Sequence, residues 1–163
     1  MQTLRDLTAA SPTDIDTELF ELLARRWTLT ERIHSLRIGI AATLWPDAAR
    51  RYGKTYRLSP AQWNDFYARS VAAAAELVPV DARIGELSAE YERRGGWSRY
   101  QLVASRSAKA GHLHRPHCHT LRMTTKVLWV PEASALGAAD VVGRFGETAC
   151  SHCFPDAPVA KVA

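Results

Sequence analysis

The sequence predicts an α+β fold in which a long antiparallel helical hairpin is followed by a small ββα module. Two long stretches space their apolar residues alternately by four and three, and each begins with a Ser-Pro pair, at residues 11–12 and 59–60. Gly95 and Gly96 then end the helical pattern, and strand-forming residues and all three cysteines follow. We therefore expect a helical hairpin or coiled-coil region over residues 1–95 and a separate module over residues 96–163.

The first long helix is expected to begin at Pro12, after a loose tail. Ser11 can cap it, and Asp14 and Asp16 place carboxylates in its first turn, at the positive end of the helix dipole. Its apolar positions form a heptad seam: Ile15, Leu19, Leu22, Leu29, Ile33, Leu36 and Ile40. Arg26 interrupts this seam, and its long side chain is expected to reach past it to solvent. Such a seam packs along another helix, either within the chain or in a homodimer.

The second long helix is expected to begin at Pro60 and to lie antiparallel to the first. The segment 46–59 contains Pro46 and Gly53 and is expected to form the connecting turn. The four-and-three spacing continues through Trp63, Phe66, Ala73, Leu77, Val80, Ile84, Leu87 and Tyr91. Proline has no backbone N–H and its ring clashes with the preceding turn, so Pro79 predicts a kink or break near residues 77–79. The helix should then continue to about Arg94.

The carboxy-terminal module is expected to contain two strands and one short helix. Residues 97–105, WSRYQLVAS, have the aromatic and β-branched content of a strand, and residues 127–130 predict a second strand that can pair with it. Residues 138–145 predict the helix, which Gly146 should end. With about sixty residues and few apolar side chains, this module would barely offset chain entropy by hydrophobic burial alone.

Two pairs of possible metal ligands supply the missing stabilisation. His114 and Cys118 stand four residues apart, Cys150 and Cys153 form a C-x2-C pair, and about thirty residues separate the two pairs. Zinc takes four nitrogen or sulfur ligands in a tetrahedron, and two short loops with two ligands each provide them. Four protein ligands leave no position for water, so the predicted site is structural. Cysteine pairs without a secretory signal favour metal binding over a disulfide.

The spacing alone does not fix the nitrogen ligand, because His112, His117 and His119 are also close to Cys118 in the sequence. We select His114, since a separation of four lets both side chains converge across a tight turn, whereas direct neighbours of Cys118 would need strained geometry. His112 is expected beside the site, and His152 is expected to point to solvent.

The pattern of these motifs resembles a known metal-binding domain. About residues 110–156 contain four motifs in order: H-x3-C, the strand-like TKVLWV, a helix-like segment ending in glycine, and C-x2-C-F-P. Together they resemble the amino-terminal metal-binding domain of bacterial Ada-type DNA alkyl-repair proteins, and the Ada-like zinc modules of some nucleases. In Ada the first of four cysteine ligands accepts a methyl group. His114 stands at that position here, so the resemblance implies a zinc fold without this reaction.

A wider resemblance covers most of the chain. Five segments are similar to those of a group of small actinobacteriophage proteins: SPTDID, EYERRGGWSRYQLV, HLHR, WVPE and CSHCFPDAPV. That similarity implies a helical region with a carboxy-terminal zinc module, a viral origin and a place in the host cytoplasm. No apolar run approaches the eighteen or so residues that a membrane helix needs, so no membrane association is expected.

Composition and charge permit an acidic partner. The net charge is +4, and hydrophobic and charged residues make up 47% and 23% of the chain, as in a folded protein. Cations surround the predicted metal site: Arg99, Arg106, Lys109, Arg115, Arg122 and Lys126. They predict contacts with nucleic-acid phosphates, while Trp97, Tyr100 or Trp129 could stack on bases. A solvated basic face is the simpler interpretation of the same residues.

Three functions are compatible with these patterns. The first is a non-enzymatic zinc-binding protein, serving as a nucleic-acid-binding or accessory module. The second is a protein-interaction factor whose helical arm binds a host or viral protein. The third, a zinc hydrolase or deaminase, is disfavoured, because Pro116 stands where a deaminase H-x-E motif would need glutamate and no H-E-x-x-H motif occurs.

Overall fold

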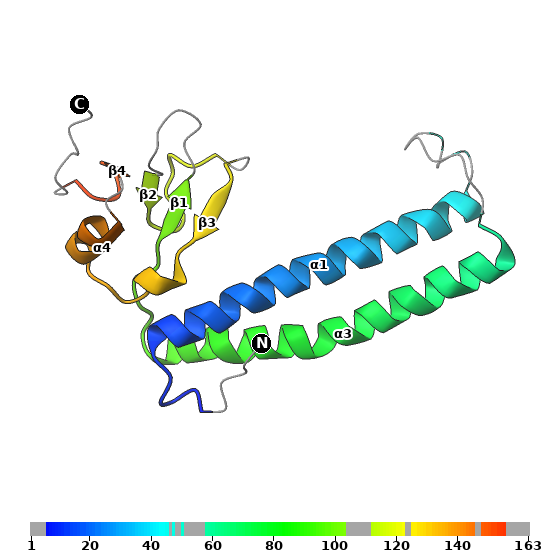
Figure 1. Cartoon of the computed structure of the whole chain (residues 1–163), viewed down its shortest axis with the longest axis horizontal. Coiled ribbons are helices and arrows are strands. Elements are labelled where there is room, and N and C mark those ends of the chain that lie inside the picture. Colours follow the sequence, from blue (N-terminus) through cyan, green and yellow to red (C-terminus); the bar gives the residue numbers. More distant parts are fainter. Residues whose placement is uncertain are drawn as a thin grey trace. The chain divides into compact units, whose positions relative to one another are not determined.

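The computed structural model describes residues 6–45, 47, 50, 58–103, 112–122, 125–145 and 148–155. Its elements are α1 (Pro12–Leu44), α3 (Pro60–Arg93), β1 (Gln101–Val103), β2 (His112–His114), β3 (Val127–Trp129), η1 (Pro131–Ala133), α4 (Ala138–Phe145) and β4 (Thr148–Ala149) (Figure 1). Long helices precede a small sheet and a short helix, which confirms the predicted α+β class.

Contacts within the chain define two compact units. One comprises Glu21–Glu86, and the other joins Met1–Phe20 to Leu87–Ala163. The second unit therefore contains the start of α1 and the end of α3 together with the sheet. The predicted division after residue 95 stays a prediction, because a cluster of contacts does not test whether residues 1–95 fold alone.

Ser11 and Ser59 cap the two long helices, as the sequence predicted, and each takes part in a reciprocal capping box, which it did not predict. The Ser11 hydroxyl accepts a bond from the backbone N–H of Asp14 at 3.1 Å, and the Asp14 carboxylate accepts one from the Ser11 N–H at 3.2 Å. At α3, Ser59 Oγ accepts from the Gln62 N–H at 3.3 Å, and Gln62 Oε1 accepts from the Ser59 N–H at 2.9 Å. These bonds satisfy N–H groups that have no partner inside the helix.

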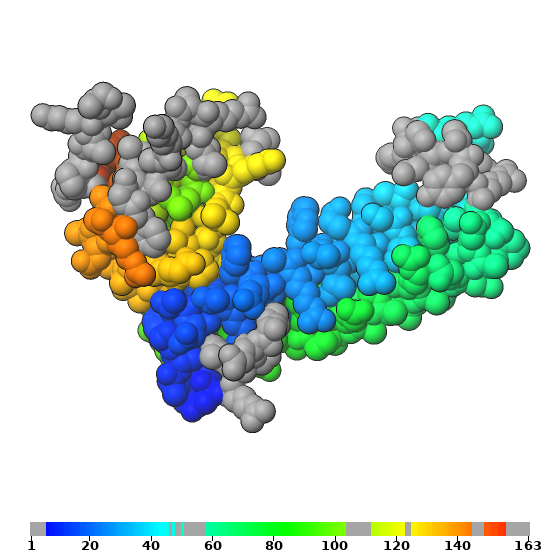
Figure 2. All heavy atoms as spheres, in the orientation of Figure 1, coloured from blue at the N-terminus to red at the C-terminus, as the bar shows by residue number. Residues whose placement is uncertain are grey.

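The unit Glu21–Glu86 is a hairpin of α1 and α3, whose surfaces run side by side in Figures 1 and 2. Its buried apolar side chains follow the predicted seams: Leu22, Leu29, Ile33, Leu36, Ala73 and Val80. Arg26 leaves the seam and pairs with Asp81 of α3 at 2.8 Å, with both side chains about half exposed at 54% and 46%. This arrangement confirms that Arg26 reaches past the seam to solvent. The predicted turn, with Pro46 and Gly53, lies mostly outside the described residues.

Helix α3 runs through Pro79 without a break, so the predicted break is wrong. Proline removes one helical hydrogen bond, but Ala73 and Val80 on either side are buried in the hairpin, and their burial holds both turns on the same partner. The helix ends as predicted. Gly95 and Gly96 adopt φ angles of 77° and 74°, and their N–H groups bond to Glu92 O and Tyr91 O at 2.9 Å each. This is a Schellman cap, which glycine accommodates without steric cost.

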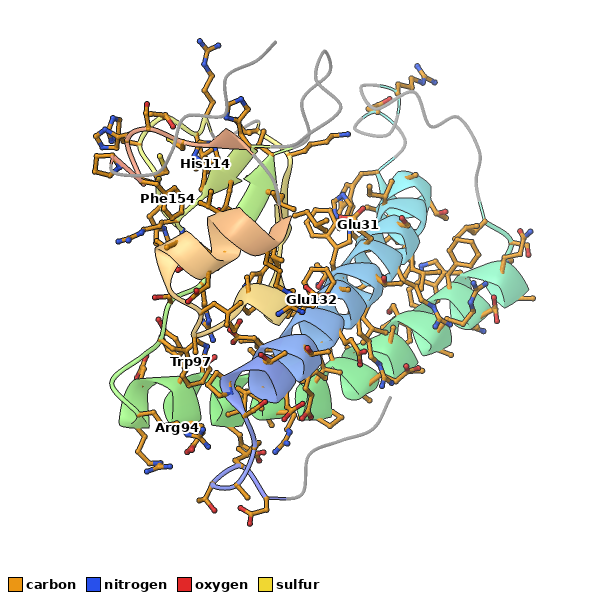
Figure 3. All side chains as sticks on the ribbon, turned by 60° about the vertical axis from the view of Figure 1, so that its left-hand side comes forward. Glu31, Arg94, Trp97, His114, Glu132 and Phe154 are labelled. Carbon is orange, nitrogen blue, oxygen red and sulfur yellow. The ribbon has the colours of Figure 1, made fainter. Side chains whose placement is uncertain are left out.

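The residues before α1 are held in place, so the expectation of a loose tail is wrong for residues 6–10. The Arg94 guanidinium donates hydrogen bonds to the carbonyl oxygens of Leu7, Thr8 and Ala10. It also pairs with Glu90 at 2.7 Å, and Glu90 pairs with Arg93. One arginine at the end of α3 thus binds the segment that leads into α1, and Figure 3 labels it there.

Asp16 has a role that its place in the first helical turn did not indicate. Its side chain is fully buried, and it accepts hydrogen bonds from Trp97 Nε1 at 2.8 Å, Arg99 Nη2 at 2.6 Å and Ser134 Oγ. The Arg99 guanidinium also lies over the Tyr91 ring, 3.7 Å from its centroid, and 4.9 Å from that of Trp129. We describe Asp16, Trp97, Arg99 and Ser134 as the Asp16 network. Its residues come from α1, from the segment before β1 and from the residue after η1.

The sheet has the strand order β3-β1-β2-β4. Strand β1 pairs antiparallel with β3, in the register Gln101↔Trp129 and Val103↔Val127, as predicted, although both strands are shorter than their sequence patterns. Strand β2 was not predicted, since its sequence His-Leu-His appeared to belong to a ligand loop. It pairs antiparallel with β1 through Leu102↔Leu113, and β4 pairs with β2 in parallel.

The core of the module lies between the sheet and α4. Its buried residues are Tyr100, Leu113, Val130, Ala133, Val141 and Phe154. The Tyr100 ring stacks on Phe154 at 6.0 Å between centroids, and its hydroxyl donates to Leu136 O at 2.8 Å. Helix α4 has the predicted bounds, and Gly146, expected to end it, lies outside the described residues. Leu113 and Phe154 bring the core next to both predicted ligand pairs.

Candidate metal centre

The first ligand pair lies at the end of β2. Leu113 is buried in the core, so the next residue, His114, is held at the strand end, and it is itself buried with 7% of its surface exposed. The chain then turns through Pro116 and His117, and His117 has a φ of 61°. This left-handed residue reverses the chain and brings Cys118 back toward His114.

The second pair follows β4, which lies next to β2. The Cys150 N–H donates to Leu113 O at 3.0 Å, so this cysteine is tied to the strand that carries His114. The Phe154 N–H donates to Cys150 O at 2.9 Å and closes a turn that contains Cys153. Phe154 anchors this turn in the core, and Figure 3 labels both Phe154 and His114 in the module. The parallel pairing of β2 and β4 therefore unites ligands that are more than thirty positions apart in the sequence.

The four predicted ligands form one cluster. Each of the four residues offers one ligand atom, and these four atoms all lie within 4.8 Å of one another: they belong to His114, Cys118, Cys150 and Cys153. In a tetrahedral zinc site with zinc–sulfur bonds of about 2.3 Å, neighbouring sulfurs are roughly 3.8 Å apart. Small side-chain movements would therefore close the cluster around a single ion. The three cysteines are free thiols and form no disulfide.

His114 carries a further sign of a metal ligand. Its Nδ1 atom is buried and has no hydrogen-bond partner in the described part of the chain. A buried polar atom without a partner is costly, and most are satisfied in native proteins. Coordination through Nδ1 would satisfy this atom, so the imidazole and the three sulfurs fit a metal ion.

The thiols of the centre have unequal surroundings. The Thr120 hydroxyl lies 3.0 Å from Cys118 Sγ and, with a smaller contribution from His114, lowers the pKa of Cys118 to about 5. Burial raises the pKa of Cys153 to about 11. Thr120 Oγ1 is also 3.9 Å from Cys150 Sγ. Thr120 could not be found from the sequence, because a threonine two residues after a cysteine belongs to no ligand motif.

The other histidines lie around the cluster rather than in it. His112 is exposed, with its ring 6.3 Å from that of His114, and His117 is exposed in the turn. His152 points to solvent, as predicted, and its ring contacts the exposed His119 at 3.9 Å between centroids. The selection of His114 as the nitrogen ligand thus agrees with the cluster.

The predicted phosphate-binding cations differ in their surroundings. Arg99 is engaged by Asp16 and keeps only 20% of its side chain exposed. Arg115, Arg122 and Lys126 are exposed, and the Arg115 guanidinium lies 5.5 Å from the Phe154 ring centroid. Arg106 and Lys109 lie outside the described residues. Of the three candidate stacking residues, Tyr100 is buried, Trp97 donates to Asp16, and Trp129 packs edge-on against Phe20.

Comparison of the chain with protein-family models, with curated proteins and with solved structures gives no match. The Ada-like resemblance therefore rests on the motif residues themselves. Among the described residues, no helix is long and apolar enough to cross a membrane.

Proposed function

We propose that this chain is a non-enzymatic zinc-binding protein whose metal centre stabilises a small nucleic-acid-binding or accessory module. The observation that carries the proposal is the convergence of His114, Cys118, Cys150 and Cys153 in one cluster. Three thiolates and one imidazole form a donor set that favours zinc over the harder ions magnesium and calcium. The Ada-like order of the ligand motifs supports the same metal.

A structural role for the zinc follows from the number of ligands. Four protein ligands complete a tetrahedron, whereas a catalytic zinc keeps one position for water or substrate. Zinc bound at such a site contributes on the order of 10 kcal/mol or more to folding, which a module whose described part has six buried core residues needs. A zinc hydrolase is therefore the least favoured of the three functions.

Nucleic acid is the partner that we propose for the module. Arg115 lies between the two residues of the first ligand pair, Arg122 follows that pair, and Lys126 precedes β3; all three are exposed. Arg99 is left out of the proposed contacts, because its guanidinium is held by a buried carboxylate. Exposed cations of this kind bind backbone phosphates without reading the sequence, so the affinity should depend strongly on salt.

The proposal is tested by measuring zinc content and nucleic-acid affinity in the same preparations. We expect one zinc per chain and binding to short DNA or RNA that weakens with salt. Replacing Arg115, Arg122 and Lys126 together with glutamine should flatten the log–log salt slope by roughly two to three units and leave zinc content unchanged. A matched control replaces Arg32, Arg37 and Arg50, which are exposed outside the module and carry the same total charge. Absence of binding to single-stranded or duplex DNA or RNA at low salt would refute the nucleic-acid role.

A protein-interaction factor is the second candidate, and the surface of the hairpin favours it. Large apolar side chains are exposed there: Leu23, Trp27, Tyr67, Val71 and Val78. Leu23 and Trp27 lie on α1 and the other three on α3; Trp27 is 69% exposed and Val78 is 67% exposed, and exposed apolar side chains that gather into a patch mark protein-interaction sites. Partner capture with and without nuclease distinguishes the two candidates, since a host or viral protein would survive nuclease treatment.

The quaternary structure and the origin of the protein belong to the same proposal. The heptad seam of α1 is buried against α3 in the hairpin, so a homodimer through that seam would require the hairpin to open. Light scattering after gel filtration measures this directly. From the resemblance to actinobacteriophage proteins we further propose a phage origin and action in the host cytoplasm, which fractionation of infected cells would test.

A further inference from the structure

The hydroxyl of Thr120 lies between the two ligand pairs of the metal centre. It is 3.0 Å from Cys118 Sγ, in the first pair, and 3.9 Å from Cys150 Sγ, in the second. Thr120 follows Cys118 by two residues, and the Leu121 N–H donates to Cys118 O at 3.0 Å to close the turn that carries it. Thr120 is an exposed residue, whereas Cys118 is buried.

Metal binding would fix the direction of this hydrogen bond. A cysteine that coordinates a metal is a thiolate, which has no proton to donate. The Thr120 hydroxyl must then be the donor and Cys118 the acceptor. Its single proton goes to the nearer sulfur, because 3.9 Å is at the limit of a bond to sulfur. A bond to an ionised acceptor is about twice as strong as a neutral one.

We propose that Thr120 is a positioning residue of the metal centre, donating its hydroxyl proton to the Cys118 thiolate and shielding that ligand from water. This inference rests on the proposed zinc site and extends it beyond the four ligands. Partners of metal ligands orient them and tune the ion, and their loss commonly costs 10- to 100-fold in metal affinity. Because Thr120 is an exposed residue and its backbone N–H also bonds to Cys118, we expect the lower end of that range.

Two substitutions at Thr120 distinguish the effect of its hydroxyl from that of the rest of the turn. Thr120→Val keeps the branched shape and the backbone N–H but removes the donor, whereas Thr120→Ser retains it. Thr125→Val is the matched control, since Thr125 Oγ1 accepts a bond from the Arg122 N–H at 3.0 Å in the same loop. The full-length protein is used throughout.

Two measurements test the inference. Chelator competition should give a zinc dissociation constant about tenfold higher for Thr120→Val than for wild type, with Thr120→Ser and Thr125→Val close to wild type. With cobalt(II) as a probe, the sulfur-to-cobalt charge-transfer band of Thr120→Val should move to longer wavelength, because a thiolate without its hydrogen bond holds its electrons less tightly. A turn that is merely loosened would lower affinity without this shift.

The outcomes distinguish this inference from the proposed zinc site. If wild-type protein binds no zinc, the metal centre itself is refuted. If wild type binds zinc and Thr120→Val has the same affinity and the same cobalt spectrum, the zinc site stands and the role of Thr120 is refuted. Equal losses in Thr120→Val and Thr125→Val would also refute it, since both would then report the stability of the loop.

Discussion

Replacing Asp16 with alanine should destabilise the protein by about 3 kcal/mol. The carboxylate is fully buried and accepts bonds from Trp97 Nε1, Arg99 Nη2 and Ser134 Oγ. Removing it leaves a guanidinium with 20% exposure and no ion partner in the described structure, together with two polar groups that lose their acceptor. Breaking a buried ion pair from one side commonly costs 3–5 kcal/mol, and the partial exposure of Arg99 places this case near the lower end.

Thermal unfolding of the zinc-loaded protein measures this effect. A loss of about 3 kcal/mol should lower Tm by roughly 6–12 °C in a chain of this size. Double substitution with Arg99→Met should recover part of the loss, because the unpaired charge is then also removed. Asp81→Ala is the matched control, since Arg26–Asp81 is also an arginine–aspartate pair, at 2.8 Å, but is half exposed, and we expect a change of less than about 1 kcal/mol. If Asp16→Ala unfolds at the same Tm as the Asp81→Ala control, the stabilising role of the Asp16 network is refuted.

Three further predictions concern the metal ligands, the end of α3 and its proline. Cys118→Ser and Cys150→Ser should each lose zinc by metal analysis while most helical circular dichroism persists; full zinc in either variant would remove that ligand from the set. Hydrogen bonds from Arg93 and then Arg94 lower the pKa of Glu90 to about 2, from 4.5. Because the pKa of Glu90 is lower in the folded protein, its ion pairs stabilise the fold above about pH 4.5, and this stabilisation is lost as the pH falls toward 2. In acid titrations, Glu90→Gln should therefore be less stable than wild type at neutral pH and equal to wild type near pH 2. Pro79→Ala restores an N–H to the exposed interior of α3 and should raise Tm, by an amount corresponding to about 1 kcal/mol or more; an unchanged or lower Tm would mean that the helix has adapted to proline.

The features that could be predicted from the sequence are those encoded by near neighbours. The caps at Ser11 and Ser59, the glycines that end α3 and the bounds of α4 all depend on residues within one or two turns. The cluster of possible metal ligands could be predicted for a different reason. Cysteine is rare here, and its chemistry restricts what two ligand pairs can do.

The features that were missed depend on side chains brought together from distant positions. Asp16 looked like a surface carboxylate at a helix start, and its partners lie 81 to 118 positions away. The bonds from Arg94 to residues 7, 8 and 10 and the central place of β2 in the sheet are equally non-local. The break expected at Pro79 shows the reverse error, since a strong local signal was overridden by burial of the helix on both sides, while the alternative of a kink stays a prediction. Local propensity is a weak guide wherever tertiary packing opposes it.

The unit that joins Met1–Phe20 to Leu87–Ala163 imposes an order on biosynthesis. Asp16 leaves the ribosome 118 residues before Ser134, which at about 5–20 residues per second is a delay of roughly 6–24 s. The Asp16 network cannot be complete before that interval ends, whereas all residues of Glu21–Glu86 have emerged earlier. Cys150 and Cys153 emerge later still. Closure of the Asp16 network and completion of the His114–Cys118–Cys150–Cys153 cluster both wait for the last part of synthesis, so a chain truncated before Cys150 would lack two of the four cluster residues.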